Sequence, residues 1–250
     1  MKVLSLFDGM ACGMLAMQKA GIEVDRYVAY EIDKYATQTA SHNFPMIEQR
    51  GDVFQTDFTE YSDFDFLIGG SPCTYWSIAQ KNNRETEASG MGWELFSQYV
   101  RALHEAKPKF FVYENNKSMS KAIRDSIDKA FGFEAICINT KATSGADGKT
   151  YPVYEVKDGK ITIKGKQYPI KLADGYYIIR KLTVRECMRL QTVPEWYEFP
   201  VSDSQAYKML GNGWTVEVIA HLLKGCMAAG EPVQCEKNPQ KVIVRRANRG

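Results

Sequence analysis

The sequence predicts an α/β fold built on a doubly wound, mostly parallel sheet. Short apolar runs alternate with amphipathic stretches through the first half of the chain, a pattern typical of strands joined by crossover helices. Glycine follows several of these runs, and glycine permits the sharp turns that end a strand. Polar or acidic residues come next. Sheets of this type bind ligands beyond the carboxyl ends of their strands, so we expect one ligand-binding edge.

The expected strands and helices alternate along the chain. Strands are predicted at residues 3–7, 27–30, 47–50, 65–68 and 110–113. Helices are predicted at residues 14–20, 34–43, 94–106 and 118–130. The strand runs are rich in β-branched and aromatic residues, whereas the first helix has helical periodicity and is closed by Gly21.

The pattern changes after Cys137. In residues 151–179, short runs of alternating apolar and polar residues are separated by Asp-Gly and Lys-Gly turns. This pattern predicts a small antiparallel meander. Thr183 and Glu186 have the spacing of a capping box, so a helix is expected to begin there. Two further helices are expected to end at Gly211 and Gly230.

The chain is expected to divide into four parts. An α/β domain occupies residues 1–140, the reduced meander region 141–179, a group of helices that completes the first domain 180–230, and a basic tail 231–250. The tail has no acidic residue after Glu236. We expect it to be frayed and solvated and not a dedicated nucleic-acid contact.

Composition limits the class of protein. A chain of 250 residues can bury one sizeable core. A net charge of +2 is too small to indicate nucleic-acid binding, so any basic surface that binds nucleic acid must be a local patch. No run has the length of a membrane span, and no signal-peptide core follows Met1. The cysteines are widely spaced without a C-x-x-C pair. We therefore expect no metal site and no disulfide framework, and a cytoplasmic location.

Cys73 is the first candidate functional residue. It follows an apolar strand, a Gly-Gly turn and Pro72, an arrangement that can present a thiol to a bulky substrate. Taken alone, an inert turn cysteine explains it equally well, and Glu114 alone is explained as a carboxylate at a helix N-terminus. The other residues at predicted strand ends are Phe7 with Gly9, Glu31 and Asp52. Five such positions at one sheet edge favour a functional site.

Together these residues resemble the DNA cytosine-5 methyltransferase family. The resemblance covers nearly the whole chain in the family's motif order. It rests on Phe7-Asp8-Gly9, Glu31-Ile32, Asp52-Val53, Gly70-Ser71-Pro72-Cys73 and Glu114-Asn115-Asn116, and on Arg180 to Glu186, Arg189-Leu190-Gln191, Pro194, Gln205, Tyr207 and Gly211-Asn212-Gly213. Asn116 stands where the family usually has valine.

The resemblance implies the S-adenosylmethionine-dependent methyltransferase fold, with S-adenosyl-L-methionine as cofactor and DNA as partner. Glu31 would bind the ribose hydroxyls, Phe7 and Ile32 would enclose the adenine, and Asp52 would meet its amino group. The remaining expected cofactor residues are Asp8, Gly9, Met10, Cys12, Val53, Pro72, Leu95, Asn212, Gly213 and Trp214.

The implied reaction needs both a thiol and an acid. Cytosine C5 is a poor nucleophile until the ring becomes electron-rich, so the Cys73 thiolate is expected to add to C6 while protonated Glu114 donates to N3. The cytosine must first leave its duplex. The loop over residues 77–92 is expected to move in this step. The expected DNA contacts are Ser77, Lys81, Arg84 and Arg185.

One element of the family is missing from the sequence. A Gln-x-Arg-x-Arg element, which would supply an arginine to the flipped base, is expected after the sixth strand and does not occur there. The target-recognition region is reduced to the lysine-bearing meander. Three alternatives stay open: a slow enzyme, a homologue that binds cofactor and DNA or a partner without turnover, and a methyltransferase of RNA or a small molecule. The leading interpretation from the resemblance is an S-adenosylmethionine-dependent DNA cytosine-5 methyltransferase, for which the family implies DNA modification by a host or a phage, as in restriction-modification.

Overall fold

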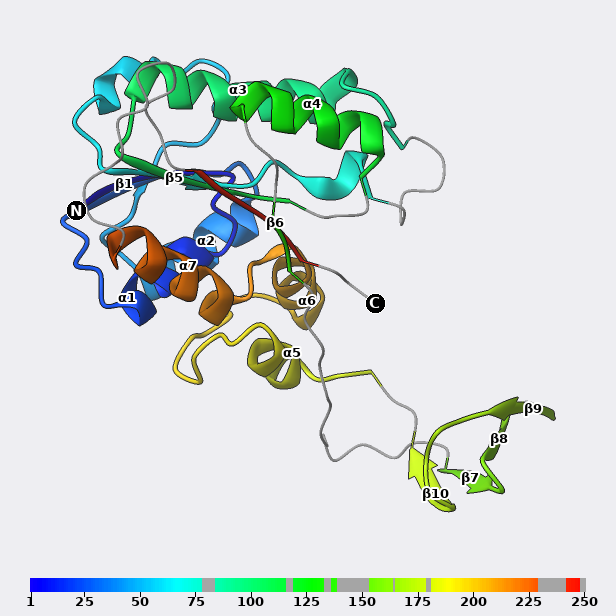
Figure 1. Cartoon of the computed structure of the whole chain (residues 1–250). Coiled ribbons are helices and arrows are strands. Elements are labelled where there is room, and N and C mark those ends of the chain that lie inside the picture. The colour runs from blue at the N-terminus through cyan, green and yellow to red at the C-terminus, as the bar shows by residue number, and fades with distance from the viewer. Residues whose placement is uncertain are drawn as a thin grey trace.

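The computed structural model describes residues 1–77, 84–115, 119–132, 136–138, 153–163, 165–178, 181–228 and 242–247. It confirms the predicted fold class. A parallel sheet carries helices on both faces, and a small antiparallel sheet stands apart from it (Figure 1). Among the described helices, none combines the length and the apolar character needed to cross a bilayer.

The elements follow the predicted alternation. The main sheet contains β1 (Lys2–Leu6), β2 (Arg26–Tyr30), β3 (Glu48–Gln49), β4 (Phe66–Gly69), β5 (Phe110–Glu114), β6 (Ile136–Ile138) and β11 (Val242–Ala247). The helices are α1 (Cys12–Ala20), α2 (Lys34–Asn43), α3 (Gly90–Ala106), α4 (Lys121–Phe131), α5 (Val184–Leu190), α6 (Asp203–Asn212) and α7 (Val216–Ala228), with short 3-10 helices η1 (Phe58–Tyr61) and η2 (Cys73–Tyr75). The strand order is β3-β2-β1-β4-β5-β11-β6, and every pair is parallel.

Helices cover both faces of the main sheet and bury two apolar cores. In Figure 1, α3 and α4 lie over one face, and α1, α2 and α7 lie over the other. The α1 side buries residues such as Met14, Ile68 and Leu223. The α3 side is aromatic and includes Tyr99, Tyr113 and Phe131. A sheet covered on both faces explains why its strands are almost continuously apolar.

Local signals set several helix ends as predicted. Gly21 takes a left-handed conformation and closes α1, which a residue without a Cβ does most readily. The Asp33 side chain accepts hydrogen bonds from the first turn of α2. Thr183 and Glu186 form the expected capping box of α5. These helices therefore begin or end where short-range hydrogen bonds satisfy exposed backbone groups.

Register explains how the functional edge forms. Leu6 pairs with Tyr30 and Gly69, and Gly69 pairs with Tyr113. The residues that follow these positions therefore lie in one row at this edge of the sheet, and the row consists of Phe7, Glu31, Gly70 and Glu114.

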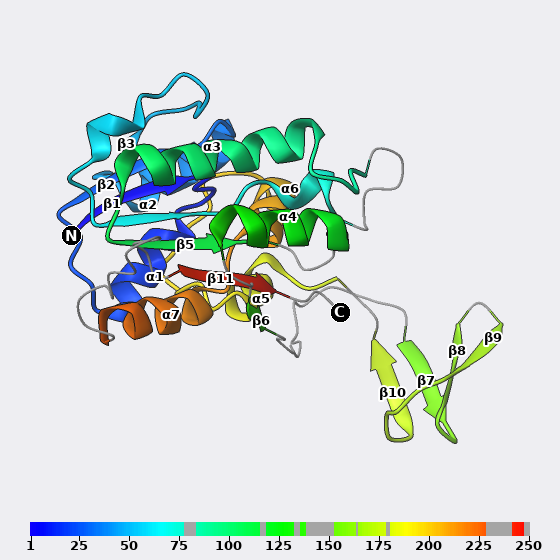
Figure 2. The same cartoon turned by 45° about the horizontal axis from the view of Figure 1, so that its top comes forward.

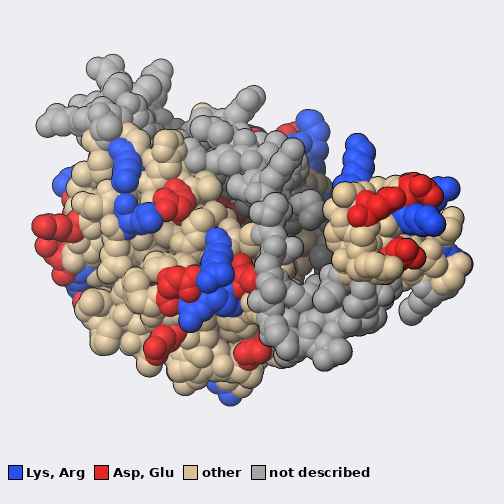
Figure 3. Space-filling view, turned by 90° about the horizontal axis from the view of Figure 1, so that it is seen from below, with Lys and Arg blue, Asp and Glu red and all other residues tan. Residues whose placement is uncertain are grey.

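The meander is confirmed as a second, antiparallel sheet. It contains β7 (Val153–Lys157), β8 (Lys160–Ile163), β9 (Lys166–Pro169) and β10 (Gly175–Ile178), in the order β10-β7-β8-β9. Figure 2 shows that it lies away from the helices. Acidic and basic side chains are interspersed on the face of the meander seen in Figure 3, so that face is not uniformly basic.

The frayed tail expected for residues 231–250 is wrong for its described part. Val242–Ala247 form β11, which lies between β5 and β6 and pairs with both. The sequence reasoning gave most weight to the basic charge of the tail. The β-branched run at residues 242–244 has high strand propensity, and pairing on both sides satisfies its backbone groups.

Candidate active site

A cavity of about 380 Å³ opens at the carboxyl ends of β1, β2, β4 and β5. It is lined by the turns after these strands, by the first turns of α2 and α7, by the end of α6 with the segment that joins it to α7, and by Gln191 after α5. Its lining includes Phe7, Asp8, Gly9, Met10, Cys12, Glu31, Asp33, Ala36, Gly70, Ser71, Pro72, Cys73, Thr74, Glu114, Asn115, Gln191, Lys208, Met209, Gly211, Asn212, Gly213, Trp214, Thr215, Val218 and Ile219. The cavity therefore joins the predicted nucleophile, the predicted acid and most of the predicted cofactor residues.

The loop between β1 and α1 has an unusual backbone. Phe7, Gly9 and Ala11 all have φ near +60°, a backbone region that residues other than glycine rarely adopt. Hydrogen bonds hold this shape: Gly9 N–H donates to Glu31 Oε2 at 2.9 Å, and the buried Tyr197 hydroxyl donates to the Met10 carbonyl at 2.6 Å. Strain maintained by such contacts is a common feature of functional sites.

Glu31 is fixed at the cavity wall by backbone donors. Oε1 accepts hydrogen bonds from Ile32 N–H at 2.9 Å and Asp33 N–H at 2.7 Å, and Oε2 accepts from Gly9 N–H. A carboxylate can accept about four hydrogen bonds. These three contacts orient the group and leave Oε2 with room for one more donor.

Burial changes the acidity of two groups beside this loop. The pKa of Asp8 is raised to about 6, chiefly by burial and also by the charge of Glu31, against the lowering effect of hydrogen bonds from Ser5 and Tyr27. Burial also raises the pKa of the Cys12 thiol to about 12. A thiol this weakly acidic is protonated at neutral pH and is a poor nucleophile. Cys12 therefore contributes to the wall and not to nucleophilic chemistry.

The Cys73 turn is locked to the end of β5. Asn115, which is buried, donates through Nδ2 to the Ser71 carbonyl at 2.8 Å and to the Tyr113 hydroxyl at 3.0 Å. The Ser71 and Tyr113 hydroxyls share a hydrogen bond of 2.6 Å. A Cβ on Gly70 would lie 2.2 Å from the Glu114 carbonyl oxygen, so only glycine allows this approach. The turn and the acid are thus built as one unit.

Cys73 begins the 3-10 helix η2 and is partly exposed. Its carbonyl accepts hydrogen bonds from Trp76 N–H at 3.0 Å and Ser77 N–H at 2.9 Å. Cys12 and Cys226 are buried, whereas Cys73 and Cys187 are partly exposed. Of these two partly exposed cysteines, only Cys73 lines the cavity.

Helix α3 begins before the end of the loop predicted for residues 77–92. Glu85 accepts hydrogen bonds from Trp76 Nε1 and from Gly92 N–H, both at 3.1 Å, and α3 already begins at Gly90. A carboxylate in this position stabilises the N-terminus of a helix. The sequence reasoning treated Gly90 and Gly92 as loop residues, whereas they form the first turn of α3.

The predicted DNA contacts lie in different places. Ser77 follows η2, and Arg84 Nε donates to the Trp76 carbonyl at 3.2 Å, which places both beside the Cys73 turn. Arg185 on α5 pairs with Glu195 at 3.1 Å. Lys81 lies outside the described residues. Their roles stay predictions.

The segment between α6 and α7 is organised by Gln191. Its side-chain amide donates to the Leu210 carbonyl at 2.8 Å and to the Gly213 carbonyl at 3.3 Å, and accepts from Thr215 Oγ1 at 2.7 Å. A Cβ on Gly213 would lie 3.1 Å from Cys12 Sγ. This packing places Asn212, Gly213 and Trp214 against the cavity, as expected.

Four predicted cofactor residues do not line the cavity: Ile32, Asp52, Val53 and Leu95. Ile32 is 78% exposed beside Glu31, and Val53 is buried in the aromatic core. Asp52 is exposed after β3, and Leu95 lies on α3. Their cofactor roles stay predictions.

Sequence reasoning did not select several residues of the cavity. Asn115 was named in the motif with Glu114 but was given no site role, although its position directly after Glu114 could have indicated one. Asp33 and Lys208 form an ion pair at the wall, although they lie far apart in the sequence. No pattern joins those two positions, and only the tertiary structure brings Lys208 of α6 to Asp33, the N-cap residue of α2.

The sheet register also places an arginine position beside Glu114. Arg245 of β11 pairs in the sheet with Glu114 of β5 on one side and with Ile136 of β6 on the other. The sequence gives no sign of this pairing, since the two strands are separated by more than half of the chain.

The fold, with its cavity at the carboxyl ends of the strands, is that of the α/β methyltransferases. Two solved structures share this fold. The S. pombe Dnmt2 methyltransferase matches with a TM-score of 0.59 and 15% identity over 91% of this chain and 98% of that chain. A Spodoptera frugiperda DNMT2 mutant matches with a TM-score of 0.62 and 15% identity over 89% of this chain and 98% of that chain.

Sequence comparison identifies the family. The family model of the C-5 cytosine-specific DNA methylases matches residues 1–131 and 123–228. The chain therefore belongs to this family.

Named relatives of the chain are methyltransferases. The orphan methyltransferase M.SPRI of Bacillus phage SPR is 38% identical over 121 residues, which are 48% of this chain and 27% of the relative. The type II methyltransferase M1.ScrFI of Lactococcus lactis subsp. cremoris is 27% identical over 300 residues, covering 87% of this chain and 76% of the relative. The match to the phage protein thus spans about a quarter of its length.

Proposed function

We propose that this chain is a DNA (cytosine-5-)-methyltransferase that uses S-adenosyl-L-methionine and forms a covalent adduct through Cys73. One observation carries the proposal: Cys73 and Glu114 line the same cavity as Phe7 and Glu31. A thiol and a carboxylic acid are the two groups needed to activate a pyrimidine ring. Membership of the family supports cytosine in DNA as the substrate.

The cavity suits the cofactor. Its volume of about 380 Å³ lies within the range of about 300–1,000 Å³ typical of small-molecule sites. Glu31 keeps one acceptor position for a ribose hydroxyl, and the Phe7 ring offers an apolar face for the adenine. When bound, the cofactor supplies an electrophilic methyl group on a sulfonium.

The residues of the site divide the reaction between them. The Cys73 thiolate forms a bond to C6 of a flipped cytosine. The electron pair of the C5–C6 double bond then forms a C4–C5 double bond, and the pair of the C4–N3 double bond moves to N3. Protonated Glu114 donates its proton to N3, which leaves C5 electron-rich enough to accept a methyl group. Once C5 carries the methyl group, the Glu114 carboxylate takes back the N3 proton. A base then removes the C5 proton, the freed electron pair re-forms the C5–C6 double bond, and Cys73 leaves C6 as a thiolate. Asn115 keeps the thiol and the acid in register throughout.

Covalent trapping tests the proposal. A duplex pool of varied sequence containing 5-fluorocytosine is incubated with the protein and cofactor, and denaturant-stable complexes are measured. Fluorine cannot leave as a proton does, so the adduct should accumulate on the wild type and be absent from Cys73→Ser. Cys187→Ser is the matched control, because Cys187 is also partly exposed and lies outside the cavity lining; it should trap normally.

Two results would contradict the proposal in different ways. Cofactor binding without any adduct or methyl transfer would indicate a homologue that binds without turnover. Trapping on fluorinated RNA and not on DNA would leave the chemistry intact and change the substrate.

A further inference from the structure

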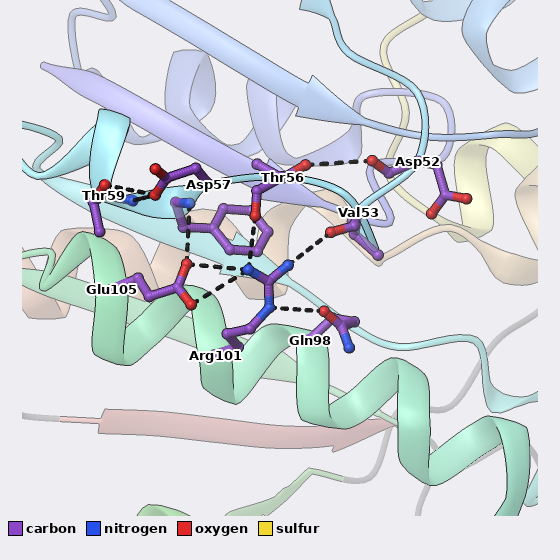
Figure 4. A network of polar contacts seen from close by, with 9 residues as sticks. Asp52, Val53, Thr56, Asp57, Thr59, Gln98, Arg101 and Glu105 are labelled. Carbon is purple, nitrogen blue, oxygen red and sulfur yellow. Dashed lines mark hydrogen bonds and ion pairs between the residues drawn. The ribbon is translucent and has the colours of Figure 1, made fainter.

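Arg101 of α3 holds the loop that follows β3. Its Nη2 donates to the Val53 carbonyl at 3.0 Å, and its Nη1 donates to the Thr56 carbonyl at 2.7 Å. Figure 4 shows the guanidinium reaching from the helix to both carbonyls. One side chain therefore fixes two backbone positions of a loop far from it in the sequence.

The guanidinium is itself held in place. Nε donates to Gln98 Oε1 at 2.9 Å, and Nη1 pairs with Glu105 at 3.1 Å. Glu105 also accepts from Phe58 N–H at 3.0 Å, and the guanidinium carbon lies 4.6 Å from the centre of the Phe58 ring. Residues 98, 101 and 105 share one face of α3. The planar, five-donor geometry of arginine suits this arrangement, and lysine cannot reproduce it.

The loop held by Arg101 begins at Asp52. Asp52 is exposed, and its carboxylate accepts a hydrogen bond from Phe54 N–H at 3.1 Å. Thr56 Oγ1 donates to the Asp52 carbonyl at 3.3 Å. Arg101 binds Val53, which directly follows Asp52, and Thr56, whose side chain donates to the Asp52 carbonyl in the same turn. The position of the Asp52 carboxylate therefore depends on where Arg101 holds the backbone.

We propose that Arg101 is a positioning residue that sets Asp52 for recognition of the amino group of the adenine. The inference rests on the proposed function, because it takes S-adenosylmethionine as the ligand, and it takes from the family resemblance that Asp52, which lies outside the cavity lining, meets the adenine amino group. Arg101 acts through the loop and makes no contact with the ligand itself. Without the Arg101 guanidinium, the Val53 and Thr56 carbonyls lose the hydrogen bonds that hold them. Asp52 then samples positions in which it cannot accept a hydrogen bond from the adenine amino group.

The first test measures the loop in the protein alone. Hydrogen exchange of the amides at residues 53–58 should be about tenfold faster in Arg101→Lys than in the wild type, as expected for the loss of backbone-anchoring hydrogen bonds. Lys121→Gln is the matched control, because Lys121 forms an exposed i,i+4 ion pair with Asp125 on α4; it should leave this exchange unchanged. Unchanged exchange in Arg101→Lys would overturn the inference.

The second test measures recognition of the amino group. Calorimetry compares S-adenosylhomocysteine with S-inosylhomocysteine, in which an oxygen replaces the adenine amino group. The wild type should prefer the adenosyl ligand by about ten- to a hundredfold, the range for a hydrogen bond to a carboxylate. Arg101→Lys should reduce this preference to within about threefold, close to that of Asp52→Asn, while Lys121→Gln keeps it.

The outcomes separate this inference from the proposed function. If the wild type binds neither ligand, the proposed cofactor is wrong and the inference falls with it. If the wild type prefers the adenosyl ligand and Arg101→Lys prefers it equally, only the inference is overturned. Should Arg101→Lys fail to fold, Glu105→Gln replaces it, because that change weakens the support of Arg101 and should reduce the preference in the same direction.

Discussion

Asp8→Asn is expected to stabilise the protein at neutral pH. The Asp8 carboxyl is 9% exposed, and Oδ1 accepts hydrogen bonds from Ser5 at 2.6 Å and Tyr27 at 2.7 Å. Oδ2 has no hydrogen-bond partner among the described residues. Asparagine keeps the acceptor for both hydroxyls and removes the charge. The change therefore isolates the effect of a buried negative charge.

The size of the effect follows from the pKa. Burial, with the charge of Glu31, raises the pKa of Asp8 from 3.8 to about 6, which corresponds to about 3 kcal/mol. Between pH 4 and pH 6 the folded state binds more protons than the unfolded state, so the Asp8 contribution to stability falls as pH rises. It is fully present below pH 4 and is lost above pH 6. At pH 7.5 the ionised carboxylate should therefore destabilise the fold by about this amount.

Urea unfolding of both proteins from pH 4 to pH 8 measures the effect. The difference between Asp8→Asn and the wild type cancels the titration of other groups. It should grow by about 3 kcal/mol in favour of the variant across this range, with its midpoint between pH 4 and pH 6. A difference that does not change with pH would refute the reasoning, and one of opposite sign would mean that ionised Asp8 has a partner in the folded state.

Three further predictions concern the active-site framework. Gly70→Ala should prevent adduct formation and destabilise the fold by about 3 kcal/mol or more, because its Cβ would lie 2.2 Å from the Glu114 carbonyl oxygen; Gly225→Ala, with no atom within 4 Å of its Cβ, should be neutral or stabilising in thermal unfolding. Asn115→Ala should cost about 1–3 kcal/mol in urea unfolding, because it leaves buried groups unpaired, and should slow trapping by 5-fluorocytosine; an unchanged trapping rate would show that the turn holds without it. Truncation after Ala228 removes β11 from between β5 and β6 and should lower the melting temperature in calorimetry; equal stability would mean that β11 contributes little to the fold.

Much of the fold could be predicted because its signals are local. The apolar runs, Gly21, and the pair Thr183 and Glu186 each act over a few residues, and the structure confirms the strand and helix order they indicate. Position along the sequence also predicted the functional edge, since parallel strands place their carboxyl ends together.

Contacts between distant segments could not be predicted in this way. β11 lies between β5 and β6, although its sequence reads as a basic tail. The fork of Arg101 binds carbonyls 48 and 45 positions away in the sequence. Asp33 and Lys208 pair across 175 positions. Side-chain type alone does not specify such partners.

The sequence by itself determined the kinds of chemistry present: a thiol after Pro72, an acid at the end of β5 and a carboxylate after β2. Only the tertiary structure decided that these groups share one cavity, and that Cys12 is a buried, weakly acidic thiol. The physical reason is that reactivity depends on burial and on neighbours. Those are set by how strands align and helices pack, and a linear pattern does not carry that information.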